Sequence, residues 1–65
     1  MKNRLKELRA RHGLSQAELG AKVGVSRQAV NALETDKHTP SLDLAYRIAA
    51  VFGESVEDVF ENPHR

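Results

Sequence analysis

Residues 14–37, LSQAELGAKVGVSRQAVNALETDK, contain two helix starts separated by a short turn. Ser15 followed by Glu18 has the pattern of a capping box, in which the hydroxyl and the carboxylate each accept a hydrogen bond from a backbone N–H. Ser26 offers the N-cap of a second helix. Gly24 opens the three-residue turn that ends at Ser26, and such a turn favours a steep angle between two helices over an antiparallel hairpin. The stretch therefore predicts two short helices that cross closely.

Close crossing requires a small residue in the first helix, and Gly20 stands where the second helix would pass. The apolar residues of the pair are then expected to face a common core: Leu19, Val23, Val25, Val30 and Leu33. The outward face of the second helix is left with Arg27, Gln28 and Asn31. These side chains suit base edges, because arginine donates two hydrogen bonds to guanine while glutamine and asparagine pair with adenine. Gln16 lies at the start of the first helix, where the dipole and the free N–H groups favour phosphate.

Three further helices are predicted, one before this stretch and two after it. The first carries Leu5, Leu8 and His12 on one face and ends at Gly13. Ser41 caps the next helix, which Gly53 ends. Ser55 opens the last helix, which contains Val56, Val59 and Phe60 and is broken by Asn62-Pro63. Nowhere do β-branched and aromatic residues alternate with polar ones as they do in a strand. The sequence thus predicts an all-α fold of five short helices in a single domain, residues 1–65.

The composition excludes several ways of stabilising or locating so small a domain. The 65 residues contain no cysteine, and the three histidines show no metal-binding spacing, so we expect neither disulfide nor metal. The longest apolar run, residues 48–52, is far shorter than the roughly 20 residues of a membrane span. Met1 is followed by charged residues instead of the apolar core of a signal peptide. We therefore expect a cytoplasmic protein that needs no cofactor. Regular helices or a second subunit are expected to stabilise it.

The net charge of +1 conceals a strong asymmetry along the chain. Residues 1–40 hold eight Lys and Arg against four Asp and Glu, a balance of +4, whereas residues 41–65 hold two against five, a balance of −3. Such asymmetry indicates that the N-terminal two-thirds faces an anionic partner, although charged helix surfaces that serve only solubility would explain the charges equally well.

Taken together, LSQAEL, Gly20, Gly24, the SRQ start of the second helix and LE before a Lys-bearing turn resemble the Cro/CI-type (XRE) transcriptional regulators. The later run PSLDLAYRIAAVFGESVEDVF is similar to the fourth and fifth helices of the same family, so the resemblance covers nearly the whole chain. It implies a compact five-helix, lambda-repressor-like domain with a helix-turn-helix at about residues 15–35. Two positions depart from the family pattern: Gly20 replaces the more usual Ala, and Thr35-Asp36 replaces Asn-Gly.

The resemblance also implies double-stranded DNA as the partner and assigns roles to individual residues. It places the helix that follows Ser26, the third of the five, in the major groove. Gln28 and Asn31 are then base readers, and Arg27 is a base or backbone contact. It makes Gln16, Ser26 and Lys37 phosphate contacts. Arg9 and Glu34 match a pair that family members use as an internal salt bridge, so we assign them to structure.

The leading functional hypothesis is a sequence-specific transcriptional regulator, such as a repressor, that acts as a homodimer on a palindromic operator. Several apolar residues outside the main core stripe fit either peripheral packing or a dimer surface: Leu44, Tyr46, Val51, Val56, Val59 and Phe60. An alternative function is a protein-interaction module, antitoxin-like or an adaptor, acting through the C-terminal surface; the two functions could coexist. We expect no enzyme and no small-molecule ligand, because each serine of interest lies at a predicted cap and no acid–base pair is visible.

Overall fold

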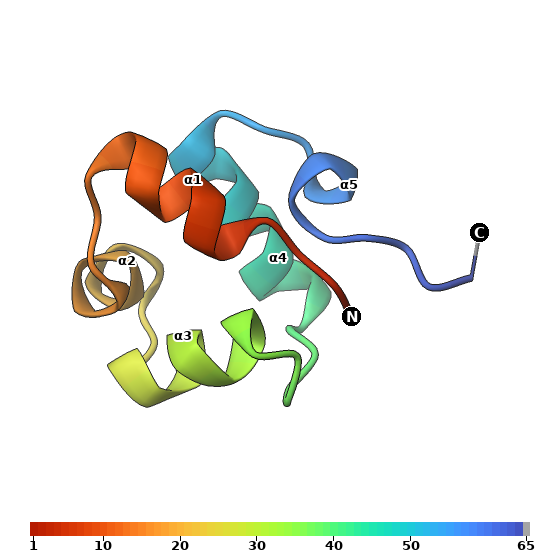
Figure 1. Cartoon of the computed structure of the whole chain (residues 1–65), viewed down its shortest axis with the longest axis horizontal. Coiled ribbons are helices and arrows are strands. Elements are labelled where there is room, and N and C mark those ends of the chain that lie inside the picture. The colour runs from red at the N-terminus through yellow and green to blue at the C-terminus, as the bar shows by residue number, and fades with distance from the viewer. Residues whose placement is uncertain (65) are drawn as a thin grey trace.

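Serine caps and glycine stops mark most of the boundaries of the five helices found in the part of the chain that the structure describes (Figure 1). The computed structural model describes residues 1–64. The helices are α1 (Leu5–His12), α2 (Gln16–Val23), α3 (Arg27–Glu34), α4 (Leu42–Phe52) and α5 (Val56–Val59). Residues 1–64 contain no strand beyond one isolated bridge, which confirms the predicted all-α fold. None of these helices is long and apolar enough to cross a membrane.

Four of the five helices begin at a serine whose hydroxyl accepts a hydrogen bond from the backbone N–H three residues later. The oxygen–nitrogen distances are 3.0, 3.1, 3.1 and 3.2 Å for Ser15, Ser26, Ser41 and Ser55. At α2 the capping box is complete, because the backbone N–H of Ser15 also donates to Glu18 Oε1 at 2.9 Å. The local polar pattern therefore sets where α2 to α5 begin.

Helix α3 ends differently from the helices that a glycine stops. Its last backbone bonds run from the N–H of Asp36 to the carbonyl of Leu33 and from the N–H of Lys37 to the carbonyl of Ala32, at 3.2 and 2.9 Å. The turn needs a left-handed residue, and Asp36 adopts φ +60° there. An aspartate thus occupies a conformation that glycine adopts without steric cost.

The core lies between all five helices and is built from side chains that are at most 9% exposed. Figure 1 shows α1 lying across α4, with α2 and α3 on one side of this pair and α5 on the other. Four of the five residues expected in the core of the α2–α3 pair are buried, and Val25 packs partly buried against them. Among residues 1–64 the buried apolar residues are Leu5, Leu8, Leu19, Val23, Val30, Leu33, Leu44, Ala45, Ile48, Ala49, Phe52, Val59 and Phe60.

The two ends of the chain run side by side, which the sequence did not predict. Asn3 and Phe60 form an isolated antiparallel bridge, and the N–H of Arg4 donates to the carbonyl of Val59 at 2.9 Å. The expectation that Phe60 belongs to the last helix is wrong, because α5 ends at Val59 and Phe60 is extended. Extension lets the Phe60 backbone pair with the N-terminal segment while its ring, 3% exposed, enters the core.

Candidate nucleic-acid interface

The contact between α2 and α3 depends on a glycine at the crossing point. Gly20 is buried, and a Cβ added to it would lie 2.5 Å from the carbonyl oxygen of Val25. The N–H of Val25 donates to the carbonyl of Gly20 at 2.9 Å, so the turn lies directly on α2. This close approach fixes the position of α3 relative to α2.

The outer face of α3, formed by Arg27, Gln28 and Asn31, is exposed as the sequence predicted. Val30 and Leu33 on the opposite side are each 1% exposed, so burial determines which side of the helix faces solvent. The side chains of this outer face form no hydrogen bond or ion pair with any residue in 1–64. A fixed helix therefore presents free donors and acceptors of the kinds that base edges accept.

Four other arginines among residues 1–64 are paired with carboxylates. Glu7 pairs with Arg4 and with Arg11, at 2.7 and 3.1 Å between the charged atoms. Arg9 pairs with Glu34 at 2.5 Å, and Arg47 pairs with Asp43 at 3.0 Å. Within residues 1–64, Arg27 is the arginine that forms no such pair. Its charge is available to a partner outside the chain.

Of the three expected phosphate contacts, Lys37 is the most available. It is exposed, and its ammonium group has no partner among the residues that the structure describes. Ser26 is exposed as well, but its hydroxyl already accepts the capping hydrogen bond from the N–H of Ala29. Asp36 lies next to Lys37 and places a carboxylate beside this surface; that carboxylate contacts the amino group of Met1.

Gln16 is half-buried, and its amide is bonded to another side chain of the protein. Its Nε2 donates to Glu34 Oε1 at 3.2 Å. The same carboxylate accepts two hydrogen bonds from Arg9, from Nη2 at 3.0 Å and from Nε at 2.5 Å, which confirms the expected internal salt bridge. This carboxylate raises the pKa of the Arg9 guanidinium, mainly by accepting its hydrogen bonds. The side chains of Arg9 and Glu34 are only 15% and 7% exposed, so little water competes for the pair.

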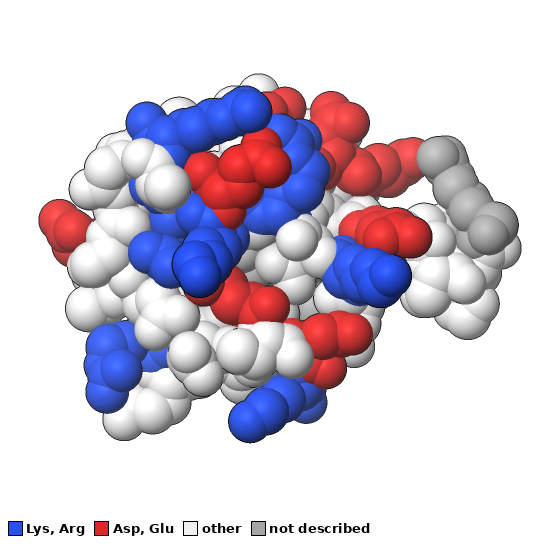
Figure 2. Space-filling view, viewed as in Figure 1, with Lys and Arg blue, Asp and Glu red and all other residues white. Residues whose placement is uncertain are grey.

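Charge is distributed unevenly over the surface. Figure 2 shows Lys and Arg side chains crowded over α1 and two separate basic groups along the lower edge, where α3 runs. Asp and Glu side chains are more numerous on the right of the same view, toward α5. On the face that Figure 2 shows, basic side chains therefore gather mainly over α1, and acidic side chains mainly toward α5.

Sequence reasoning missed the role of Arg47, which ties α4 to the end of α2. Its Nη1 donates to the carbonyl of Val23 at 2.6 Å, just before the turn, while its Nε pairs with Asp43. The unsatisfied carbonyls at a helix C-terminus attract cations, but the sequence does not show which cation comes near. Only the packing of α4 against α2 brings the two together.

For three of the residues expected either in peripheral packing or on a dimer surface, the structure favours packing. Leu44, Val59 and Phe60 are 9%, 1% and 3% exposed, so the monomer already covers them and they have little surface to offer a partner. Val51 and Val56 pack partly buried against the core. The large apolar side chains that remain exposed are Leu42 and Tyr46, at 67% and 61%.

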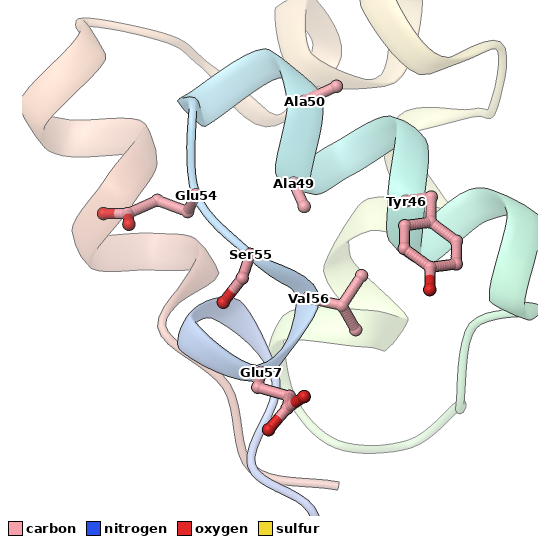
Figure 3. A pocket seen from close by; sticks show the side chains of 7 residues that line it. All are labelled: Tyr46, Ala49, Ala50, Glu54, Ser55, Val56 and Glu57. Carbon is pink, nitrogen blue, oxygen red and sulfur yellow. The ribbon is translucent and has the colours of Figure 1, made fainter.

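A shallow hollow of about 400 Å³ lies beside Tyr46, between α4 and α5. Figure 3 shows Tyr46 projecting from α4 near Val56 at the start of α5, with Ala49 and Ala50 further along α4. Glu54 and Glu57 also line it, which gives this apolar hollow an acidic border.

Two short helices crossing at a buried glycine, the second with an exposed polar face, define a helix-turn-helix domain. The chain belongs to the helix-turn-helix family HTH_3, whose model matches residues 5–59. This confirms the family resemblance that the sequence indicated.

Relatives and solved structures agree with this membership. An uncharacterized HTH-type transcriptional regulator of Methanocaldococcus jannaschii is 53% identical over 92% of this chain and 91% of its own length. The uncharacterized HTH-type transcriptional regulator YgzD of Bacillus subtilis is 55% identical over 92% of this chain and 91% of its own length. The P22 c2 repressor, solved in complex with a synthetic operator, superposes with a TM-score of 0.80 at 26% identity, covering 83% of this chain and 82% of that one. The N-terminal DNA-binding domain of SinR from Bacillus subtilis superposes with a TM-score of 0.80 at 28% identity, covering 95% of this chain and 91% of that one.

Proposed function

We propose that this protein is a transcriptional regulator that binds double-stranded DNA and reads its sequence with α3 in the major groove. The observation that carries the proposal is the outer face of α3, where Arg27, Gln28 and Asn31 are exposed and unpartnered on a helix fixed by the core. Bidentate pairing to guanine or adenine requires such free guanidinium and amide groups on a rigid element. Membership of a family with transcriptional regulators and a fold shared with an operator-bound repressor support the same function.

Residues flanking α3 supply the contacts that hold the helix in the groove. Lys37, just beyond the C-terminal end of α3, reaches one phosphate with its free ammonium group. At the other end the backbone N–H groups of the first turn, next to the Ser26 cap, point toward the partner as a helix N-terminus does. Gln16 supplies a phosphate contact from the start of α2. Such contacts fix the register of the protein on the duplex but carry no sequence information themselves.

The protein binds as a homodimer, so that two copies of α3 read half-sites about one helical turn apart, roughly 34 Å. A monomer of 65 residues presents one short reading helix, and few base contacts give little discrimination. Leu42 and Tyr46, with the hollow between α4 and α5, supply the exposed apolar surface that a second copy would cover. Because the relatives come from archaea and bacteria, whose DNA lies in the cytoplasm, we place the protein there.

Selection of bound sequences from a random double-stranded DNA pool tests this function. The expected result is an enriched motif with two inverted half-sites whose centres are about 10 base pairs apart. A single half-site without symmetry would contradict the dimer. A pool without any enriched motif after repeated rounds would contradict sequence-specific binding itself.

A further inference from the structure

Three segments that are distant in the sequence meet at the carboxylate of Glu34. This residue is the last of α3, and it accepts hydrogen bonds from Arg9 in α1 and from Gln16, the first residue of α2. A further bond from Arg9 Nη1 to the carbonyl of Leu14, 2.9 Å long, ties the α1–α2 connection to the same cluster. One buried carboxylate thus links the reading helix to the start of α2.

The chemistry of the carboxylate determines how the Gln16 amide is turned. An ionised carboxylate only accepts hydrogen bonds, so the amide must present its NH2 group to Glu34 and point its oxygen elsewhere. The NH2 group has two hydrogens, and the bond to Glu34 uses one of them. The other hydrogen is left at the N-terminus of α2, where the helix dipole favours an anion.

Arg9 keeps this arrangement in place. Its two bonds to Glu34 hold both carboxylate oxygens, and 7% exposure of the Glu34 side chain leaves it little room to rotate. A glutamine without such an anchor has three freely rotating side-chain bonds and loses this freedom only when it binds DNA. An anchored amide loses much less.

We propose that Glu34 is a positioning residue for the DNA backbone: it orients the Gln16 amide in advance, so that the remaining N–H meets a phosphate oxygen when α3 enters the groove. The inference rests on the proposed function, since it needs DNA to be bound with α3 in the major groove. Arg9 acts one step further out, by holding Glu34. The ion pair therefore contributes to DNA binding as well as to stability.

A double-mutant cycle on DNA affinity separates positioning from a purely structural role. Gln16→Ala, Glu34→Gln and the double variant are titrated against one fluorescently labelled duplex carrying the selected operator. We expect Gln16→Ala to weaken binding about 10-fold, as the loss of a hydrogen bond to a charged group does. Glu34→Gln should weaken the wild type about fivefold but the Gln16→Ala protein less than about twofold, because no amide is then left to orient.

Gln28 provides the matched control, because it is a second glutamine on the proposed DNA-facing side and its side chain makes no hydrogen bond to Glu34. If Glu34 only held α3 in place, Glu34→Gln would couple to Gln28→Ala as strongly as to Gln16→Ala. We expect coupling to Gln16 alone, with additive effects at Gln28. Equal coupling at both glutamines, or additivity at Gln16, would overturn the inference.

Stability is measured beside affinity, because Glu34→Gln also breaks the ion pair with Arg9. Circular dichroism at the assay temperature gives the folded fraction, by which each affinity is corrected. Arg9→Lys serves as a second variant that keeps the charge but not the two-bond geometry, and we expect it to weaken binding about twofold and only when Gln16 is present. No loss in Arg9→Lys with a folded protein would contradict the anchoring by Arg9. Failure of the wild type to bind any duplex would instead refute the proposed function.

Discussion

Gly20→Ala is expected to destabilise the protein although alanine is the better helix former. Helix propensity alone favours the variant by about 1 kcal/mol. The added methyl group, however, would lie 2.5 Å from the carbonyl oxygen of Val25, so the turn must move away by more than half an ångström to reach ordinary contact. Overpacking costs about 1–3 kcal/mol, and the upper part of this range, about 2–3 kcal/mol, applies here because the obstructing atom belongs to the backbone and not to a flexible side chain. With the propensity gain subtracted, the free energy of unfolding should fall by about 1–2 kcal/mol.

Thermal unfolding followed by circular dichroism measures the effect of Gly20→Ala. For a domain of this size, 1–2 kcal/mol corresponds to a decrease in Tm of roughly 5–15 °C. Ala21→Gly is the control: Ala21 is exposed in the same helix, so this change should cost about 1 kcal/mol through propensity alone. A Gly20→Ala protein more stable than the wild type would refute the close crossing of α2 by the turn.

Three further predictions concern single residues of the same framework. Arg47→Met removes the donor to the Val23 carbonyl and should lower the free energy of unfolding, measured in urea, by about 1–2 kcal/mol. Asp43→Ala breaks only the exposed ion pair with Arg47 and should lower it by less than about 0.5 kcal/mol. The Ser15 backbone N–H lowers the pKa of Glu18 below its ordinary 4.5, so the ionised carboxylate stabilises the fold at higher pH and this stability is lost as the pH falls through the lowered pKa. Glu18→Gln keeps the capping box without an ionisable group, and its free energy of unfolding should therefore decrease less between neutral and acid pH. Asp36→Gly relieves the strain of the left-handed backbone and should raise Tm. Asp36→Gly and Asp36→Asn each remove a carboxylate beside Lys37, so both should strengthen binding to every DNA sequence alike in anisotropy titrations.

The helices could be predicted from the sequence because their ends are encoded locally. Ser15 and Glu18 need only each other and the adjacent backbone to begin α2, and a glycine stops a helix without help from distant residues. The outer face of α3 was predicted for a related reason: once Val30 and Leu33 are buried, helical periodicity places Arg27 and Asn31 outside.

The errors arose where distant segments decide the structure. Phe60 leaves the helix because the N-terminal segment pairs with it, and nothing near Phe60 in the sequence announces that partner. For Leu44 and Val59 the sequence allows either peripheral packing or a dimer surface, because periodicity does not tell how far the neighbouring helices cover a face; their burial favours packing. The bond between Gln16 and Glu34 was missed in the same way, since the position of the Gln16 amide depends on where α1 and α3 pack.

Central to the proposed function is the claim that the outer face of α3 reads base sequence while its flanks hold the backbone. The most direct test compares Gln28→Ala with Lys37→Ala by titrating the selected operator and single-base variants of it at several salt concentrations. We predict that Gln28→Ala loses about 1–3 kcal/mol of discrimination at one base position. Lys37→Ala should weaken all duplexes alike and reduce the dependence on salt by about one phosphate contact. Unchanged base discrimination in Gln28→Ala, Arg27→Ala and Asn31→Ala would contradict the claim.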